Sequence, residues 1–147
     1  MERRTMLQTL PMAAMLPAAV WAEATKREHG GLEPDANTVY ELRVYHVAEG
    51  KLPELLARFR DHTIGLFSKH GIKSVAYWTL TDEPGKSNTL IYILQHPSRE
   101  EATTNWKAFQ DDAEWKSVKE KSEVNGKLVD KVDSTYMVLT DFSPRLR

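Results

Sequence analysis

Residues 38–47 read TVYELRVYHV, and this short stretch decides how the rest of the chain is organised. Polar residues alternate with apolar and aromatic ones, and β-branched residues are frequent, which is typical of a β-strand. Successive side chains of a strand point to opposite faces of its sheet. The strand then has two faces, one with Tyr40, Leu42, Val44 and His46 and one with Val39, Glu41, Arg43, Tyr45 and Val47.

The segment after this strand has the pattern of a helix. Pro53 stands where the first helical turn accepts proline, and Gly71 stands where a helix commonly ends in a left-handed residue. At about 100° per residue, the apolar side chains between them form a single arc on the helix surface. This arc contains Leu52, Leu55, Leu56, Phe59, Thr63, Leu66, Phe67 and His70.

Two further strands and a second helix follow. KSVAYWTL at 73–80 and NTLIYILQH at 88–96 have strand composition and are joined by the turn sequence TDEPGKS. Ser98 and Glu101 have the spacing of a capping box and open the second helix. Its predicted buried stripe contains Ala102, Trp106, Phe109 and Ala113.

The last part of the chain continues this helix and adds a strand. Asp112 can cap a helical continuation, the pair Asn125-Gly126 marks a turn, and STYMVLTDF at 134–142 reads as the final strand. The order β-α-β-β-α-β over 38–144 is the ferredoxin-like arrangement, an α+β fold with an antiparallel sheet. The last three residues, 145–147, form a tail.

A sheet of this kind has helices on one side only, so its other face needs a cover. The second face carries apolar residues, and a second copy of the chain can cover them if the two sheets pack face to face. We therefore expect a homodimer in the form of a dimeric α+β barrel. A monomer with a polar second face is the alternative.

Composition excludes several classes of function. The chain of 147 residues has 20 basic and 21 acidic residues, a balance that argues against a nucleic-acid partner. It contains no cysteine, which excludes disulfides, thiolate metal sites and cysteine nucleophiles.

The first 22 residues have the pattern of an export signal. Two arginines precede an uncharged stretch that ends in Val20-Trp21-Ala22, where small residues suit cleavage after Ala22, with Ala24 as a second option. The paired arginines resemble a twin-arginine signal. The alternative is a retained membrane anchor, although two prolines in the stretch oppose a stable membrane helix. Residues 23–37 read as a polar linker. Because the signal predicts export, we expect a periplasmic or extracellular protein without a stable anchor.

Two histidines of the first helix, His62 and His70, are candidate metal ligands. They are eight residues apart, or about 12 Å along the axis, whereas ligands of one zinc ion lie about 2 Å from the metal. They are therefore not a chelating pair, and we expect no metal site and no cofactor. The position of His70 in the last helical turn favours a structural role. His62 lies at the edge of the apolar arc, where it can face a cavity.

Other candidates for ligand contact lie on the strands and on the second helix. Arg43 can clamp a carboxylate with its planar guanidinium, or pair with Glu41. Aromatic residues with a polar tip suit a mainly apolar pocket, and they suit an ordinary core equally. The predicted ligand-binding residues are Arg43, Tyr45, His62, Tyr77, Tyr92, Asn105 and Trp106.

Several blocks of the chain resemble the NIPSNAP family. They are YELRVY, GKLPELLARFRDHT, LFSKHG, VAYW, NTLIYILQH, SREEATTNWKAFQDDAEW and DFSP. The resemblance implies a fold of the dimeric α+β barrel superfamily and a molecular activity that is unsettled. That superfamily also includes cofactor-independent monooxygenases and haem-binding or haem-degrading proteins.

No spacing in the chain identifies a reaction, so catalytic residues are not assigned and a binding protein is favoured over an enzyme. We expect an exported homodimer that holds a small apolar or aromatic ligand between sheet and helices. The alternatives are a monooxygenase-like or haem-binding or haem-degrading enzyme, and a protein-interaction module without a pocket.

Overall fold

A computed structural model describes residues 36–144 and residue 146. The predicted export signal at 1–22 and nearly all of the predicted linker lie outside the described residues. Within the described part of the chain, every helix is too short or too polar to cross a membrane.

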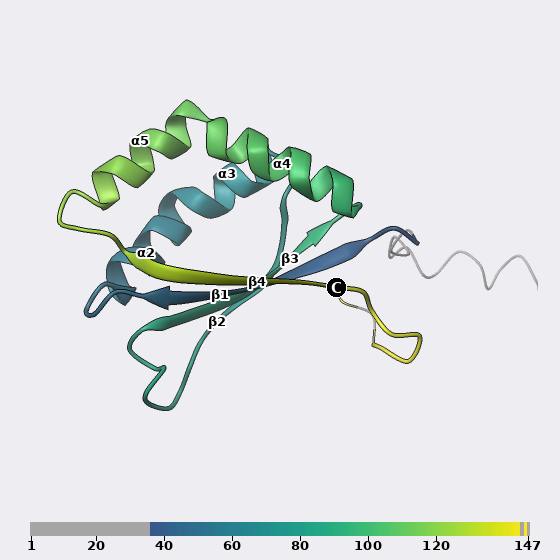
Figure 1. The fold of residues 1–147 in the computed structure, drawn as a ribbon, viewed down its shortest axis with the longest axis horizontal. Coiled ribbons are helices and arrows are strands. Elements are labelled where there is room, and N and C mark those ends of the chain that lie inside the picture. Colours follow the sequence, from purple (N-terminus) through teal and green to yellow (C-terminus); the bar gives the residue numbers. More distant parts are fainter. Residues whose placement is uncertain (1–35, 145, 147) are drawn as a thin grey trace, which may run out of the picture. The chain divides into compact units, whose positions relative to one another are not determined.

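The strands form one antiparallel sheet in the order β2-β3-β1-β4 (Figure 1). This is the predicted ferredoxin-like order, with the first strand in the middle of the sheet. The strand bounds are β1 (Val39–Val47), β2 (Lys73–Thr79), β3 (Thr89–His96) and β4 (Val129–Met137).

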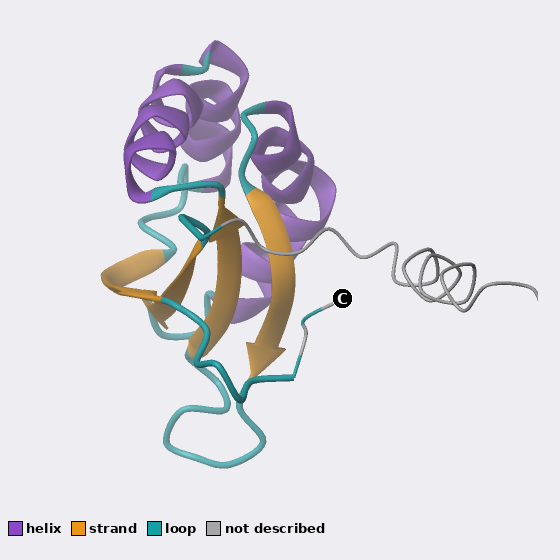
Figure 2. Cartoon of the chain, turned by 90° about the vertical axis from the view of Figure 1, so that its right-hand side faces the viewer, coloured by secondary structure: helices purple, strands orange, loops and turns teal. Residues whose placement is uncertain are grey.

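All the helices between residues 36 and 144 lie on one side of the sheet, as expected (Figure 2). The first helical segment has three parts and the second has two. They are α2 (Leu52–Arg58), a π-helical turn (Phe59–Thr63), α3 (Ile64–Lys69), α4 (Arg99–Asp111) and α5 (Ala113–Ser122). The helices face the side of β1 that carries Glu41, Arg43 and Tyr45, so the predicted division of its two faces is correct.

The π-helical turn was not predicted by the sequence pattern. The backbone N–H of Ile64 donates to the carbonyl of Phe59, five residues earlier, and the Thr63 hydroxyl donates to the carbonyl of Arg58 at 3.2 Å. A wider turn advances each residue by a smaller angle, so His62 stands farther round the helix from Phe59 than in an α-helix. His62 is consequently exposed, whereas Phe59 and Thr63 remain buried.

Two sequence predictions in the C-terminal half were wrong. The last strand begins at Val129 and ends at Met137, not at 134–142, because its charged first half pairs with β1 through backbone hydrogen bonds. Charged side chains are frequent on edge strands, where they hide the strand pattern. Ala113 is exposed because Asp112 is extended, with ψ of 126°, and interrupts the helix before the stripe reaches Ala113.

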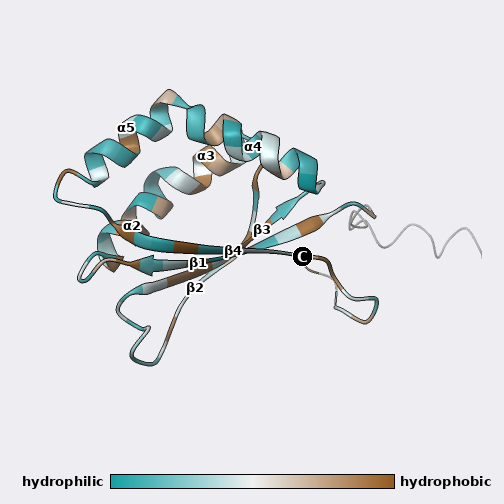
Figure 3. Cartoon of the chain, in the orientation of Figure 1, coloured by the Kyte–Doolittle hydropathy of each residue, from teal (hydrophilic) through white to brown (hydrophobic). Residues whose placement is uncertain are grey.

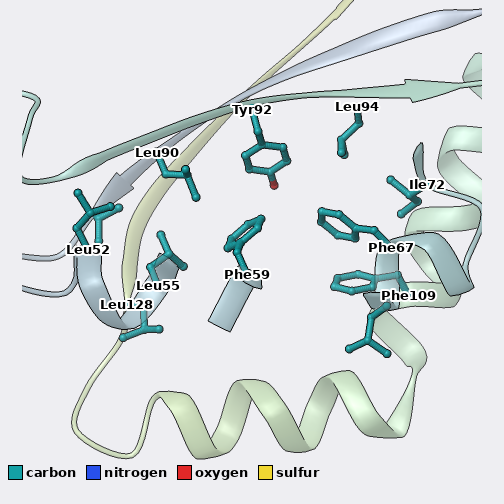
Figure 4. Packing of buried hydrophobic residues seen from close by; sticks show 12 residues of the cluster. Leu52, Leu55, Phe59, Phe67, Ile72, Leu90, Tyr92, Leu94, Phe109 and Leu128 are labelled. Carbon is teal, nitrogen blue, oxygen red and sulfur yellow. The ribbon is translucent and has the colours of Figure 1, made fainter. Parts of the chain in front are cut away.

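The core fills the space between the sheet and the helices (Figure 4). Leu55, Phe67, Tyr92 and Leu94 are at most 1% exposed and come from both layers. Helix α5 contributes no fully buried residue and is largely hydrophilic (Figure 3). It therefore covers the core less completely than α2 and α3 do, and the grooves described below follow its two sides.

Candidate functional site

A buried carboxylate organises the middle of the sheet on its helix side. Glu41 is 1% exposed, and its Oε1 accepts hydrogen bonds from Arg43 and from the Ser134 hydroxyl, each at 2.7 Å. Its Oε2 accepts from the Trp106 indole at 2.6 Å and lies 3.1 Å from Nε2 of His96. We call these five residues the Glu41 cluster, and it ties α4 and three strands together.

Burial alone would raise the pKa of Glu41. Hydrogen bonds from His96, Ser134, Trp106 and Arg43 outweigh burial and lower the pKa to about 2. Glu41 is thus a carboxylate at neutral pH. Arg43 pairs with Glu41, which is one of the two roles that the sequence allowed, and so its guanidinium is already engaged.

The guanidinium of Arg43 also connects this cluster to a layer of aromatic side chains. It lies 4.4 Å from the centre of the Trp106 ring and 5.6 Å from that of Tyr45. The rings around Tyr92 form the aromatic layer, which contains Tyr45, Phe59, Phe67, Tyr77 and Tyr92.

Tyr92 lies at the centre of this layer. Its ring centre is 5.2 Å from Tyr45, 5.3 Å from Phe59 and 5.3 Å from Tyr77, and its hydroxyl points away from the sheet towards Phe59 (Figure 4). Within the described residues, this hydroxyl has no hydrogen-bond partner. Burial and the neighbouring Tyr45 raise the pKa of Tyr92 well above its ordinary value, so the hydroxyl keeps its proton.

Beside the aromatic layer, a groove of about 260 Å³ opens between α5 and β4, and we call it the Tyr45 groove. Tyr45 and Trp115 contribute aromatic rings to its lining, and Val129 and Val132 contribute apolar side chains. The remaining lining residues are charged: Arg58, Lys119, Glu123, Lys127, Asp130 and Lys131.

Arg58 forms one wall of this groove and is held firmly in place. Its side chain is 5% exposed and donates to Oε1 of Glu123 at 3.0 Å and to the Ser122 hydroxyl at 3.2 Å. The guanidinium also lies 5.3 Å from the centre of the Trp115 ring. Glu54, four residues before Arg58 on the same helix, pairs with Lys51 at 2.9 Å.

A second, larger groove of about 470 Å³ lies on the other side of Arg58. One of its walls is α5, and the other is formed by α2 together with the π-helical turn. We call it the His62 groove. His62 lines it together with Asp61, Lys121 and Asn125. Its lining mixes both signs of charge with the apolar side chains of Ala57, Val118 and Val124, and it contains no Phe, Tyr or Trp.

The predicted site residues divide among these places. Tyr77, Tyr92 and Trp106 are packed around Arg43 and Phe59 and line neither groove, whereas Tyr45 reaches the Tyr45 groove. His62 is separated from them in its own groove. Asn105 donates to the carbonyl of Gly71 at 3.4 Å, which fixes α4 against the end of the first helical segment.

His70 has the structural role that its position indicated. Its Nε2 lies 2.7 Å from Oδ2 of Asp112, the same oxygen that Lys69 contacts at 2.8 Å. Oδ1 of Asp112 caps α5 by accepting from the backbone N–H of Glu114 at 2.7 Å. The Lys69 hydrogen bond, followed by that of His70, holds the pKa of Asp112 well below its usual range. Among the described residues, no group of three or more His, Asp or Glu side chains is arranged to hold a metal ion.

Sequence reasoning missed Arg58, Trp115, Lys119 and Lys127 as lining residues. Trp115 gave a signal, because it is an aromatic residue in the otherwise charged segment AEWKSVKEKSEV. The others gave none, since lysines and arginines on helices and loops usually face solvent.

The four-stranded antiparallel sheet, with helices on one face and an aromatic layer between, defines a ferredoxin-like α+β protein with an open sheet face. The chain belongs to the NIPSNAP family, whose model matches residues 40–144. No curated protein matches the sequence.

Solved structures with this fold include family members from two bacteria. A NIPSNAP-like domain protein from Burkholderia xenovorans is 16% identical, with a TM-score of 0.65, over 76% of this chain and 92% of that chain. A NIPSNAP family protein from Agrobacterium tumefaciens is 20% identical, with a TM-score of 0.64, over 74% of this chain and 98% of that chain.

A monooxygenase from Streptomyces coelicolor, in complex with the ligand nanaomycin D, is also similar. It is 14% identical, with a TM-score of 0.53, over 74% of this chain and 93% of that chain. At such identities, these likenesses show a common fold.

Proposed function

We propose that this chain is an exported, homodimeric binding protein that holds a small apolar or aromatic ligand in the Tyr45 groove. The observation that carries the proposal is the lining of that groove. Ligand sites are concave and combine apolar and aromatic walls with polar groups that orient the ligand. The Tyr45 groove combines two aromatic rings and two valine side chains with six charged side chains.

The dimensions of the groove limit the ligand. Pockets for drug-sized molecules are roughly 300–1,000 Å³, so about 260 Å³ suits a molecule with a single ring or a short chain. Behind Tyr45, the ring centres of Phe59 and Tyr92 lie 5.8 Å and 5.2 Å from that of Tyr45, so these rings close the inner side of the groove and keep the ligand in front of them.

Filling the groove tests this proposal. Val132 lies on the edge strand, faces the groove and is 37% exposed, so Val132→Trp is expected to fill the groove with little loss of stability. Val138→Trp is the matched control, because Val138 lies just beyond the same strand and is 71% exposed. The probe is 3-phenylpropanamide. Its binding to the full chain is measured by saturation-transfer NMR.

Wild type and the Val138 variant should both transfer saturation to the probe, and the Val132 variant should transfer little. Equal transfer in all three proteins would place binding elsewhere, and no transfer from the wild type would refute the proposed ligand class.

The proposed dimer rests on the face of the sheet that none of the helices within residues 36–144 covers. This face carries Leu42, Val44, Ala76, Trp78, Ile91 and Ile93, and Trp78 is 46% exposed. A second copy of the chain offers the same apolar face, and burying both removes them from water.

Sedimentation equilibrium tests the dimer at micromolar concentration. Trp78→Glu places a charge in the proposed interface, and we expect it to shift the dimer towards monomer by at least about tenfold in Kd. Ile64→Glu is the matched control, since Ile64 is 38% exposed on the helix side of the sheet. A monomeric wild type would contradict the dimer.

Export is proposed on the sequence of residues 1–22 alone. The intact mass of the protein recovered from the periplasm of an exporting host tests it. A chain that begins after Ala22 or Ala24 supports export, and an uncleaved chain opposes it.

The alternative is a cofactor-independent monooxygenase-like enzyme, or a haem-binding or haem-degrading one. The fold likeness to the Streptomyces coelicolor monooxygenase supports it, but one fold hosts many activities. The carboxylate of Glu41 is occupied by Arg43, Ser134, Trp106 and His96, so the groove supports binding more directly. Oxygen uptake on addition of an aromatic probe, followed with an electrode, would favour the enzyme.

A further inference from the structure

We infer that the ligand of the Tyr45 groove is a small aromatic carboxylate, with its ring on the aromatic lining and its carboxylate between Lys119 and Lys127. This inference rests on the proposed function and adds the chemical class of the ligand.

The groove is positive although the chain is not. The full sequence has a net charge of −1, whereas the lining has four basic residues and two acidic ones. A concave site lined mainly by one sign of charge attracts ligands of the opposite sign. The groove therefore selects anions from solution.

Several of these charges are already paired, which shows where an anion is free to bind. Arg58 is paired with Glu123, and Lys131 lies 2.8 Å from Asp133, which stands outside the groove. Within residues 36–144, neither Lys119 nor Lys127 forms an ion pair.

These two lysines approach the groove from different elements. Lys119 lies on α5 and Lys127 on the loop between α5 and β4. Asp130 is also unpaired within the described residues and opposes them. Two lysines against one aspartate leave a surplus of one positive charge, which matches a single carboxylate.

A cationic ligand is disfavoured for a separate reason. The face of an aromatic ring attracts cations, but the guanidinium of Arg58 already lies over the Trp115 ring, 5.3 Å from its centre. A second cation there would meet a fixed, nearly buried positive charge.

A matched pair of probes separates this inference from the proposed function. The probes are 3-phenylpropanoate and 3-phenylpropanamide, which differ in charge and share the ring and chain length. Both are titrated into the full ¹⁵N-labelled chain at pH 7 and low salt, and Kd is read from amide shifts. We expect the carboxylate to bind about three- to tenfold more tightly than the amide.

Variants assign the effect to particular side chains. Lys119→Gln and Lys127→Gln should each weaken carboxylate binding roughly two- to fivefold, and Asp130→Asn should strengthen it by a similar factor. Binding of the amide should be unchanged in all three. Lys86→Gln is the control, because Lys86 is exposed on the loop between β2 and β3.

The possible outcomes are distinct. Equal affinity for the two probes, or tighter binding of the amide, overturns the carboxylate inference and leaves the proposed binding function intact. If both lysine variants still bind the carboxylate more tightly than the amide by the wild-type factor, the anion binds elsewhere and the inference is also overturned. If neither probe binds, the proposed function fails together with the inference.

Discussion

Replacing Glu41 by glutamine is expected to lower the free energy of unfolding by about 3 kcal/mol, because it removes the negative charge from a buried group of hydrogen-bond donors. Removing one partner of a buried ion pair usually costs about 3–5 kcal/mol, since the other charge is left uncompensated. The lower end applies because the side chain of Arg43 is 17% exposed and gains some hydration. Glutamine keeps the shape of the side chain, so the loss reports charge and hydrogen bonding.

Urea unfolding followed by tryptophan fluorescence measures the effect. Glu49→Gln is the matched control, because Glu49 is exposed on the loop after β1, and it should change the free energy by less than about 0.5 kcal/mol. A loss below about 1 kcal/mol for the Glu41 variant would mean that the cluster contributes little to stability.

The same carboxylate gives the fold a defined response to acid. Its pKa is lowered from an ordinary value of 4.5 to about 2 in the folded protein, so the unfolded chain takes up the proton more readily. The stability that Glu41 contributes is therefore fully present above pH 4.5 and is lost as the pH falls towards 2. The Glu41→Gln variant should lack this component, while the acid response due to Asp112 and Asp133 remains in both proteins.

The sequence could predict the fold because its main signals are local. The alternation in β1 placed Glu41, Arg43 and Tyr45 on one face, and Gly71, with φ of +72°, ended the first helical segment as expected. The capping oxygen of Ser98 accepts from the backbone N–H of Glu101 at 3.1 Å, again as the local pattern indicated.

Properties that depend on distant partners could not be predicted. The partners of Glu41 come from α4, β3 and β4, and none of Trp106, His96 and Ser134 has a spacing relation to it in the sequence. Arg58 shows the same limit, because its partner Glu123 lies 65 residues away and a nearer acid was available. The grooves follow from these long-range pairs, so their linings were largely beyond sequence reasoning.

Two substitutions in the aromatic layer are expected to change stability in opposite directions. Phe59→Ala should lower the free energy of unfolding by about 3–5 kcal/mol, because it leaves a cavity in the layer. The Phe59 ring is 3% exposed and packs edge-on against Tyr45, Phe67, Tyr77 and Tyr92.

Tyr92→Phe should instead raise the free energy of unfolding by about 1 kcal/mol. The Tyr92 hydroxyl is buried and lacks a partner within the described residues, and leaving such a group unsatisfied costs about 1–3 kcal/mol. Urea unfolding measures both variants, and a loss of stability in Tyr92→Phe would show that the hydroxyl has a partner in solution.

The Tyr92 variant also tests the predicted role of this residue in ligand contact. A ligand that reaches the hydroxyl supplies the missing partner, so saturating 3-phenylpropanoate should then stabilise the wild type more than the Tyr92→Phe variant. Equal stabilisation of the two proteins would assign Tyr92 to packing and confine the ligand to the groove in front of Tyr45. The Tyr92→Phe substitution alters a group behind the aromatic lining and leaves the charges of the groove unchanged. This comparison is therefore independent of the lysines.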